Sequence, residues 1–141
     1  MGVFFRVSVV RVLVVDDFAG FRDAICSMLR NRPDMLVVGE ASDGLEAVRK
    51  AEDLQPDLIV LDLSMPKLNG LEATRRIRTL SPKSKIIIAS LESSADFVQE
   101  ALRSGAAGYV IKAELFNQLP PAIDAVLQGK RWFVEPVDDI R

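Results

Sequence analysis

Five residues that could carry out phosphate chemistry stand at the ends of apolar segments: Asp16, Asp17, Asp62, Ser90 and Lys112. A carboxylate beside a buried strand costs free energy unless it is paired, solvated or bound to a metal. Crowded carboxylates also raise one another's pKa. A divalent cation relieves this repulsion, and carboxylate oxygens with several waters suit Mg²⁺, with Mn²⁺ as an alternative. The three aspartates therefore predict a metal site, and Lys112 would balance the remaining charge.

Such a site suits phosphoryl transfer, which needs an in-line nucleophile and positive charge around the equatorial phosphoryl oxygens. An aspartate can itself be the nucleophile and form an aspartyl phosphate. Asp62 is the candidate, because it ends the apolar segment DLIVLD. The cation and Lys112 would hold the phosphoryl group, and the Ser90 hydroxyl would hydrogen-bond to it.

Five short apolar runs must position these residues. The runs are continuous rather than alternating, which is typical of strands covered on both faces of a parallel sheet. They are Val12–Val15, Met35–Val38, Leu58–Leu61, Ile86–Ala89 and Tyr109–Ile111. Helical segments follow them at Phe18–Arg32, Gly44–Leu54, Gly70–Leu80, Ala95–Ser104 and Pro120–Gln128. The pattern predicts an α/β fold of the (βα)5 type, a doubly wound five-stranded parallel sheet with helices on both faces.

In a sheet of this type, ligands bind at the carboxyl ends of the strands, where the five candidate residues would converge. The ends of the helices carry further signals. Gly105 and Gly129 stand where a helix is expected to end. Pro120 and Pro121 suit the first turn of the last helix, because backbone N–H groups there have no helical partner.

Composition excludes several other classes of protein. The chain has 141 residues, with 18 basic and 20 acidic side chains and a net charge of −2, so it lacks the basic face that nucleic-acid binding favours. The net charge does not exclude binding through a small local basic patch. The chain contains no histidine, so an imidazole base or ligand is excluded. The single cysteine, Cys26, fits a reducing compartment and a small buried side chain. No apolar run approaches the length of a membrane span, so we expect a cytoplasmic protein with no membrane partner.

In combination, these residues resemble the receiver domain of two-component response regulators, and most closely the receivers of the NarL/LuxR subfamily. The resemblance covers about residues 10–130. It depends on Val15-Asp16-Asp17, on Asp62-Leu63-Ser64-Met65-Pro66 with Gly70, on Ser90, and on Gly108-Tyr109-Val110-Ile111-Lys112. The resemblance implies a flavodoxin-like, CheY-like fold.

The resemblance also implies roles for individual residues. Asp62 would accept a phosphoryl group from a sensor histidine kinase. Mg²⁺ would be bound by Asp17, Asp62 and the backbone carbonyl of Ser64, with Asp16 acting mainly through water. Ser90 and Tyr109 would form the conformational switch, acting on the face made by the fourth helix, fifth strand and fifth helix. Such a protein is a phosphoacceptor and not an enzyme, beyond self-phosphorylation from small donors and self-dephosphorylation.

The expected organisation is an N-terminal extension (1–9), the receiver (10–130) and the start of a linker or tail (131–141). Receivers of this subfamily usually precede a helix-turn-helix domain, so DNA binding is expected only through an output domain absent from this chain. A homodimer would use the face of the fourth helix, fifth strand and fifth helix, or that of the first and fifth helices. Trp132 and Phe133 are expected to cap the end of the last helix.

Two positions depart from the commonest receiver pattern. Ala113 follows Lys112 where many receivers have proline, and Leu91 follows Ser90 where many have a small residue. We expect Leu91 to narrow the access to Asp62 and to slow phosphate exchange.

Three other functions compete with this interpretation. A pseudo-receiver or stand-alone receiver would act by protein contacts only. A phosphohydrolase of the haloacid dehalogenase type would carry a second acid where this chain has Ser64. A nucleotide- or flavin-binding module would have a glycine-rich loop where this chain has Asp16-Asp17-Phe18-Ala19-Gly20.

Overall fold

Strands and helices alternate along the computed structural model, which describes residues 8–135. The strands are β1 (Val10–Val15), β2 (Met35–Ala41), β3 (Leu58–Leu61), β4 (Lys85–Ser90), β5 (Gly108–Ile111) and β6 (Trp132–Phe133). The helices are α1 (Ala19–Arg30), α2 (Gly44–Leu54), α3 (Gly70–Leu80), α4 (Ala95–Ser104), the short 3₁₀ helix η1 (Lys112–Glu114) and α5 (Leu115–Leu127). This confirms the predicted α/β alternation, and α2, α3 and α4 have the predicted bounds.

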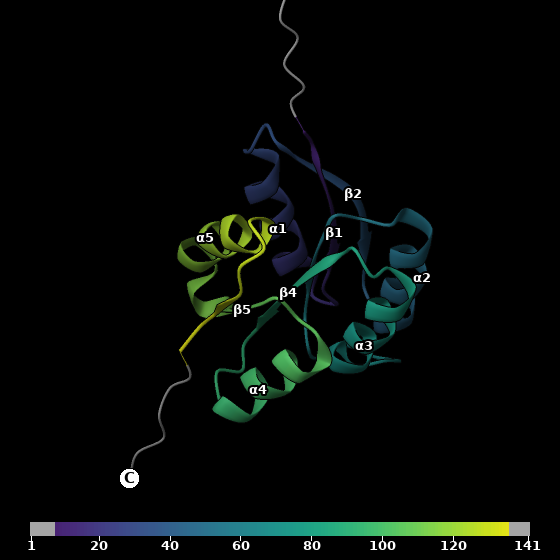
Figure 1. Cartoon of the computed structure of the whole chain (residues 1–141), viewed down its shortest axis with the longest axis vertical. Coiled ribbons are helices and arrows are strands. Elements are labelled where there is room, and N and C mark those ends of the chain that lie inside the picture. The colour runs from purple at the N-terminus through teal and green to yellow at the C-terminus, as the bar shows by residue number, and fades with distance from the viewer. Residues whose placement is uncertain (1–7, 136–141) are drawn as a thin grey trace, which may run out of the picture.

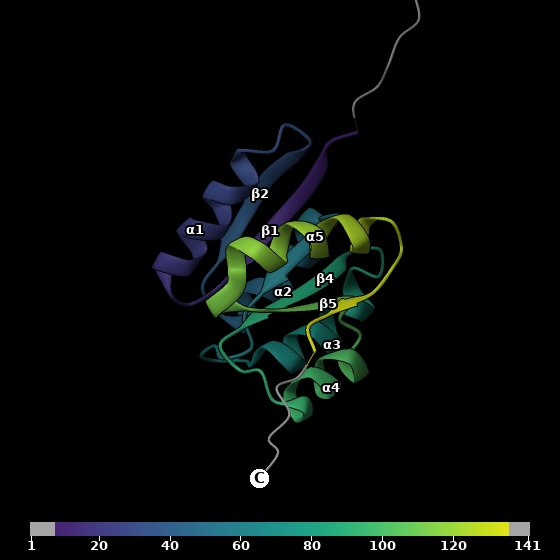
Figure 2. The same ribbon diagram turned by 90° about the vertical axis from the view of Figure 1, so that its left-hand side faces the viewer.

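The strands form one parallel sheet in the order β2-β1-β3-β4-β5-β6. The chain moves outward from β1 to β2, and then crosses back to β3 on the other side of β1. The carboxyl ends of β1 and β3 therefore meet at the switch in strand order, where ligands bind in sheets of this kind. Figures 1 and 2 show the helices on both sides of the sheet.

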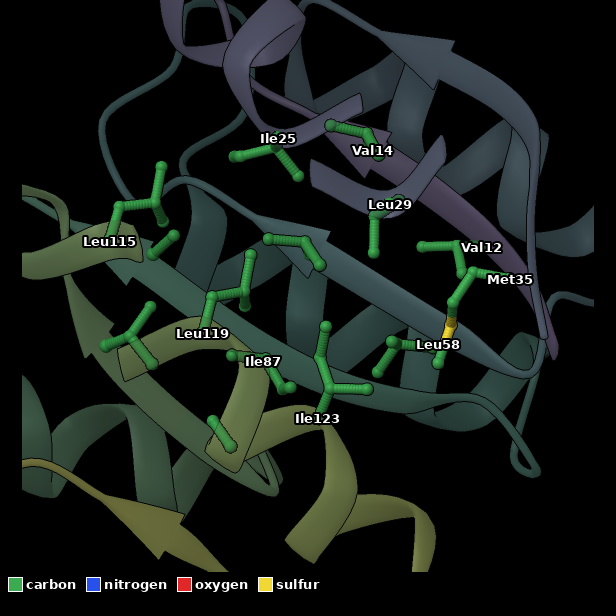
Figure 3. Packing of buried hydrophobic residues seen from close by; sticks show 14 of the residues in the cluster. Val12, Val14, Ile25, Leu29, Met35, Leu58, Ile87, Leu115, Leu119 and Ile123 are labelled. Carbon is green, nitrogen blue, oxygen red and sulfur yellow. The ribbon is translucent and has the colours of Figure 1, made fainter. Parts of the chain in front are cut away.

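Two apolar cores hold the layers together, one on each face of the sheet. On one face, side chains of α1 and α5 pack against those of the central strands, and Figure 3 shows them pointing toward one another. The labelled residues are Val12, Val14, Ile25, Leu29, Met35, Leu58, Ile87, Leu115, Leu119 and Ile123. On the other face, α2, α3 and α4 cover the alternate strand residues, such as Leu13, Ile59 and Ile88. Leu58–Leu61 are fully buried, which fixes the strand that leads to Asp62.

Local signals explain where several helices begin and end. The carboxylate of Asp43 accepts a hydrogen bond from the amide of Glu46, and the side chain of Asn69 does the same for Glu72. These side chains satisfy N–H groups that have no partner within the helix. Gly105 ends α4 in the left-handed conformation, with φ 103°, as predicted.

Within residues 8–135 the sheet has six strands, so the predicted number of five was wrong. Trp132 and Phe133 do not simply cap α5. They form β6, which lies parallel to β5 and pairs with Gly108 and Tyr109. The amide of Trp132 donates to the Ala107 carbonyl at 3.1 Å, and the amide of Val134 donates to the Tyr109 carbonyl at 3.1 Å. Two residues are too few to produce a recognisable strand pattern.

The predicted start of α5 was also wrong. The helix begins at Leu115, so Pro120 and Pro121 lie inside it rather than in its first turn. Each proline removes one helical hydrogen bond, and the carbonyls that lose their partners are those of Phe116 and Asn117. Both residues are exposed, so water can satisfy these carbonyls. Ahead of the helix, Lys112–Glu114 form η1, so Ala113 leads directly into α5.

Within residues 8–135, no helix is both long and apolar enough to cross a membrane.

Candidate functional site

The backbone places Asp16 and Asp62 side by side at the carboxyl edge of the sheet. The amide of Asp62 donates to the Val15 carbonyl at 3.0 Å, and the amide of Asp16 donates to the Ala41 carbonyl at 3.1 Å. These bonds extend the strand ladders by one residue into the site. The two carboxylates therefore start from neighbouring, fixed positions.

Gly70 brings the start of α3 against the end of β3. A Cβ atom at this position would lie 2.2 Å from the carbonyl oxygen of Asp62 and 2.7 Å from the Cα of Leu63. The Gly70 amide donates to the Leu63 carbonyl at 2.8 Å. Any side chain here would push against the backbone of Asp62, so glycine is required for this close approach.

The three aspartates form an acidic cluster. Their carboxylate oxygens lie within 4.8 Å of one another. Asp16 and Asp62 are buried, at 1% and 5% exposure, whereas Asp17 is exposed. Asp16 Oδ1 accepts a hydrogen bond from the amide of Phe18 at 2.9 Å, which fixes its carboxylate at the start of α1. Asp16 Oδ2 accepts no hydrogen bond of good geometry, although it is buried.

Lys112 supplies the positive charge of the site. Its Nζ lies 2.7 Å from Asp16 Oδ2 and 3.3 Å from Asp62 Oδ1, and its side chain is only 4% exposed. The same ammonium lies over the ring of Phe21, 4.4 Å from the ring centroid. A buried ammonium needs such partners, because an uncompensated charge is costly in the interior.

The pKa of Asp62 is raised to about 6. Burial is the main cause, because it disfavours the ionised carboxylate. Lys112 acts in the opposite direction and lowers this pKa, while the negative charge of Asp16 raises it further. The site is therefore short of positive charge for two buried carboxylates.

Ser90 and Tyr109 meet at the loop between β4 and α4. Ser90 Oγ accepts a hydrogen bond from the amide of Glu92 at 3.0 Å. The Tyr109 hydroxyl donates to the carbonyl of Glu92 at 2.6 Å, and the whole residue is buried. Burial also raises the pKa of the Tyr109 phenol. The loop that follows Ser90 is thus bound to both residues predicted to form the switch.

A pocket of about 380 Å³ opens above Asp62. Ser64, Ser90 and Lys112 line it together with Asp62, and Phe18 and Leu91 form part of its rim. Leu91 is 68% exposed, so it stands at the entrance rather than in the core. A second groove, of about 660 Å³, runs from Asp17 and Ser64 to Phe97 of α4. Small molecules can therefore approach Asp62 through the pocket above it.

The structure brings Asp16, Asp17, Asp62, Ser90 and Lys112 together at the carboxyl edge of the sheet. The donor set suits a hard divalent cation, because it combines three carboxylates with the nearby backbone of Ser64. The excess of two buried carboxylates over the one ammonium of Lys112 points the same way. The acidic cluster could therefore bind a metal ion.

Phe21 was not predicted to be part of the site. Phe21 belongs to the apolar stripe of α1 and packs against the core below it. Its additional contact with Lys112 depends on how α1 and η1 meet, and a periodic apolar pattern carries no signal for that contact.

The chain is similar in sequence to several known proteins. The response regulator receiver domain family matches residues 12–124. The chain is 45% identical over 121 residues to a protein-glutamate methylesterase/protein-glutamine glutaminase of Thermotoga maritima, a match that covers 82% of this chain and 35% of the relative. It is 41% identical over 129 residues to the nitrate/nitrite response regulator protein NarL of Escherichia coli, covering 92% of this chain and 60% of the relative. The chain thus spans between about a third and three fifths of the length of these curated relatives.

A solved structure is similar over nearly the whole fold. It is a two-component response regulator of the LuxR family from Aurantimonas sp. SI85-9A1, with a TM-score of 0.84, 37% identity and 89% of each chain covered. The chain belongs to the family of response regulator receiver domains of two-component systems, among those of the NarL/LuxR type.

Proposed function

We propose that Asp62 is the phosphoacceptor of a signalling switch. The observation that supports this most directly is the position of Lys112 Nζ between Asp16 and Asp62, at 2.7 Å and 3.3 Å, below an open pocket. Because two buried carboxylates share one ammonium, the site favours the binding of a further cation. The ammonium can also leave one carboxylate for another negatively charged group. A phosphoryl group on Asp62 gives Lys112 a new oxygen to bind.

The donor is the phosphohistidine of a sensor histidine kinase. A carboxylate oxygen of Asp62 forms a bond to phosphorus while the phosphorus–nitrogen bond breaks. The histidine leaves with the electron pair of that bond and is then protonated. Lys112 stabilises the charge on the phosphoryl oxygens, and Ser90 donates a hydrogen bond to the product.

The acidic cluster holds Mg²⁺, or Mn²⁺ in its place. Asp17, Asp62 and the backbone carbonyl of Ser64 would bind the ion, and Asp16 would act mainly through water. A bound divalent cation supplies positive charge that offsets the charge of the phosphoryl oxygens. Asp17 is exposed and can share the ion with solvent, as Mg²⁺ sites usually do.

Ser90 and Tyr109 transmit the change to the surface. When Ser90 binds the phosphoryl group, the loop that carries Glu92 shifts, because the Glu92 amide donates to Ser90 Oγ. This shift also moves the Glu92 carbonyl, to which the buried Tyr109 hydroxyl donates, and so changes the position of Tyr109. The result is a population shift of the face formed by α4, β5 and α5.

The output is transcription, through a helix-turn-helix domain that lies outside this chain. The NarL/LuxR-type relatives support this, although the methylesterase relative carries a similar receiver on a different protein. Because β6 belongs to the sheet, we propose that the receiver unit extends from Val10 to about Val134. A homodimer would use α1 and α5, or the face of α4, β5 and α5, and in the second case it would also contact β6.

One experiment tests the proposed chemistry. The protein is incubated with Mg²⁺ and acetyl phosphate, and its intact mass is measured. We expect a gain of one phosphoryl group that is absent in Asp62→Asn. Asp57→Asn is the matched control, because Asp57 stands at the other end of the same strand and its carboxylate accepts a hydrogen bond from the amide of Arg11. A label that persists in Asp62→Asn would contradict the proposal, and a wild-type protein without label would favour a pseudo-receiver.

A further inference from the structure

Three groups surround the ammonium of Lys112, which has three N–H donors. Two are the carboxylates of Asp16 and Asp62, at 2.7 Å and 3.3 Å from Nζ. The third is the ring of Phe21, whose centroid lies 4.4 Å from Nζ. With only 4% of the side chain exposed, water has little access to the ammonium. The ring of Phe21 therefore contacts the side of the ammonium that neither carboxylate occupies.

Phe21 is itself held in place on two sides. Its side chain packs against the core beneath α1. The ring of Phe18 meets it edge to face, with centroids 5.5 Å apart and planes at 67°. This arrangement suits the quadrupoles of both rings. The core and the Phe18 ring thus hold the Phe21 face toward Lys112.

We propose that Phe21 is a positioning residue for Lys112. The negative face of the ring attracts the ammonium and holds the long, flexible lysine chain beneath the Asp62 carboxylate. When a phosphoryl group reaches Asp62, the ammonium exchanges one carboxylate contact for a phosphoryl oxygen while it remains over the ring. The effect on phosphorylation rests on the proposed function, whereas the attraction between Phe21 and Lys112 exists without it.

An apolar side chain of the same size would fill the core equally well, so the test must change the ring's charge distribution and not its volume. Ring fluorination does this, because it weakens the negative face with little change of shape. Phe21 is replaced by phenylalanines that carry one, two and three ring fluorines. The same series at Phe116 is the matched control, since Phe116 is 70% exposed at the start of α5 and lines neither the pocket above Asp62 nor the neighbouring groove.

The rate of labelling by acetyl phosphate is measured for each protein at saturating Mg²⁺. We expect the logarithm of the rate to fall stepwise with fluorination at Phe21, to about a fifth or a tenth of the wild-type rate for the trifluorinated ring. We expect the Phe116 series to remain flat. Equal rates along the Phe21 series would overturn the inference.

A second measurement needs no phosphoryl donor. The midpoint of urea unfolding is compared along the Phe21 series in the wild-type chain and in Lys112→Met. We expect fluorination to lower the midpoint only where Lys112 is present, and an equal shift in both backgrounds would show that Phe21 acts by packing alone. If the wild-type protein takes no label, the proposed function fails, and the unfolding comparison then decides the role of Phe21 by itself.

Discussion

Buried polar groups lie at both ends of the parallel strands, but they are fully hydrogen-bonded at one end and incompletely paired at the other. At the amino end, Ser84 Oγ donates to the carbonyl of Pro56 at 2.5 Å and also bonds to Ser81 Oγ at 2.6 Å. Arg11 nearby donates to the carbonyls of Leu54 and Gln55. Ser81 and Ser84 are buried, and their hydroxyls are satisfied by neighbours in the same chain.

At the carboxyl end, the polar groups are equally buried and incompletely satisfied. The two buried carboxylates of Asp16 and Asp62 share one ammonium, and the pKa of Asp62 is raised to about 6. A satisfied buried network stabilises one structure, whereas an incomplete one has a cost that a ligand can relieve. The difference separates a structural end of the sheet from a functional one.

The largest effect is expected from removing the shared cation. Lys112→Met should lower the rate of labelling by acetyl phosphate by about 100-fold or more, because one preorganised charge is lost. It should also destabilise the protein at pH 7 by roughly 3 kcal/mol, since two buried carboxylates lose their partner. Labelling is followed by intact mass and stability by urea unfolding. Lys85→Met, at the amino end of β4, is the control and should retain both properties.

The second prediction concerns Asp62 and pH in the absence of metal. Its pKa is raised from 3.8 to about 6 on folding, so the folded protein binds the proton more tightly than the unfolded chain. The stability that Asp62 contributes is therefore complete below about pH 4 and is lost as the pH rises through 6. Asp62→Asn should be more stable than the wild type at pH 7.5 by about 1–3 kcal/mol, and the advantage should shrink toward pH 4.5. Urea unfolding followed by circular dichroism at both pH values gives the answer, and a destabilised variant at pH 7.5 would contradict the comparison.

At the structural end, the expected pattern is reversed. Ser84→Ala leaves Ser81 Oγ and the Pro56 carbonyl with fewer hydrogen bonds, and should cost about 2 kcal/mol of stability. The rate of labelling at Asp62 should stay within about twofold of wild type under conditions where the variant is folded, because this change lies at the opposite edge of the sheet. A large loss of labelling in a folded Ser84→Ala protein would show that the two ends are coupled.

The smallest effect is expected at the rim of the pocket. Leu91 is 68% exposed beside Asp62, so Leu91→Ala should change stability by less than about 0.5 kcal/mol. It should raise labelling by acetyl phosphate and the rate of self-dephosphorylation by roughly twofold to fivefold, which corresponds to an obstacle of about 0.5–1 kcal/mol. Leu36→Ala, on the exposed side of β2, serves as the control. Unchanged rates in Leu91→Ala would show that Leu91 does not limit access to Asp62.

The sequence was most informative where the structure is most regular. Continuous apolar runs predicted β1 to β5, and the residues at their carboxyl ends predicted which side chains would converge. β6 was missed because Trp132 and Phe133 are too short a segment to show a period, and their pairing with β5 depends on the path of the chain after α5. The start of α5 was missed because Pro120 and Pro121 are tolerated in its second turn by exposed carbonyls, which only the structure reveals.

The site shows a similar limit. Residue type and position predicted that Asp62 and Lys112 would lie close together. The burial that raises the pKa of Asp62 could not be predicted in this way, because it is a property of the packed sheet. Phe21 could not be separated from the other core residues of α1, because its second contact comes from an element far along the chain.

The pairing of β6 with β5 has an optical consequence. The chain contains one tyrosine and one tryptophan, and they occupy these two neighbouring strands, with Trp132 opposite Gly108 and Tyr109 next along. Light absorbed by Tyr109 can therefore be transferred to Trp132 and emitted there. Because the chain has one such donor and one such acceptor, the ratio of the two emissions measures how closely β6 lies against Tyr109. The protein thus carries its own resonance-energy-transfer pair, and no label needs to be attached to use it.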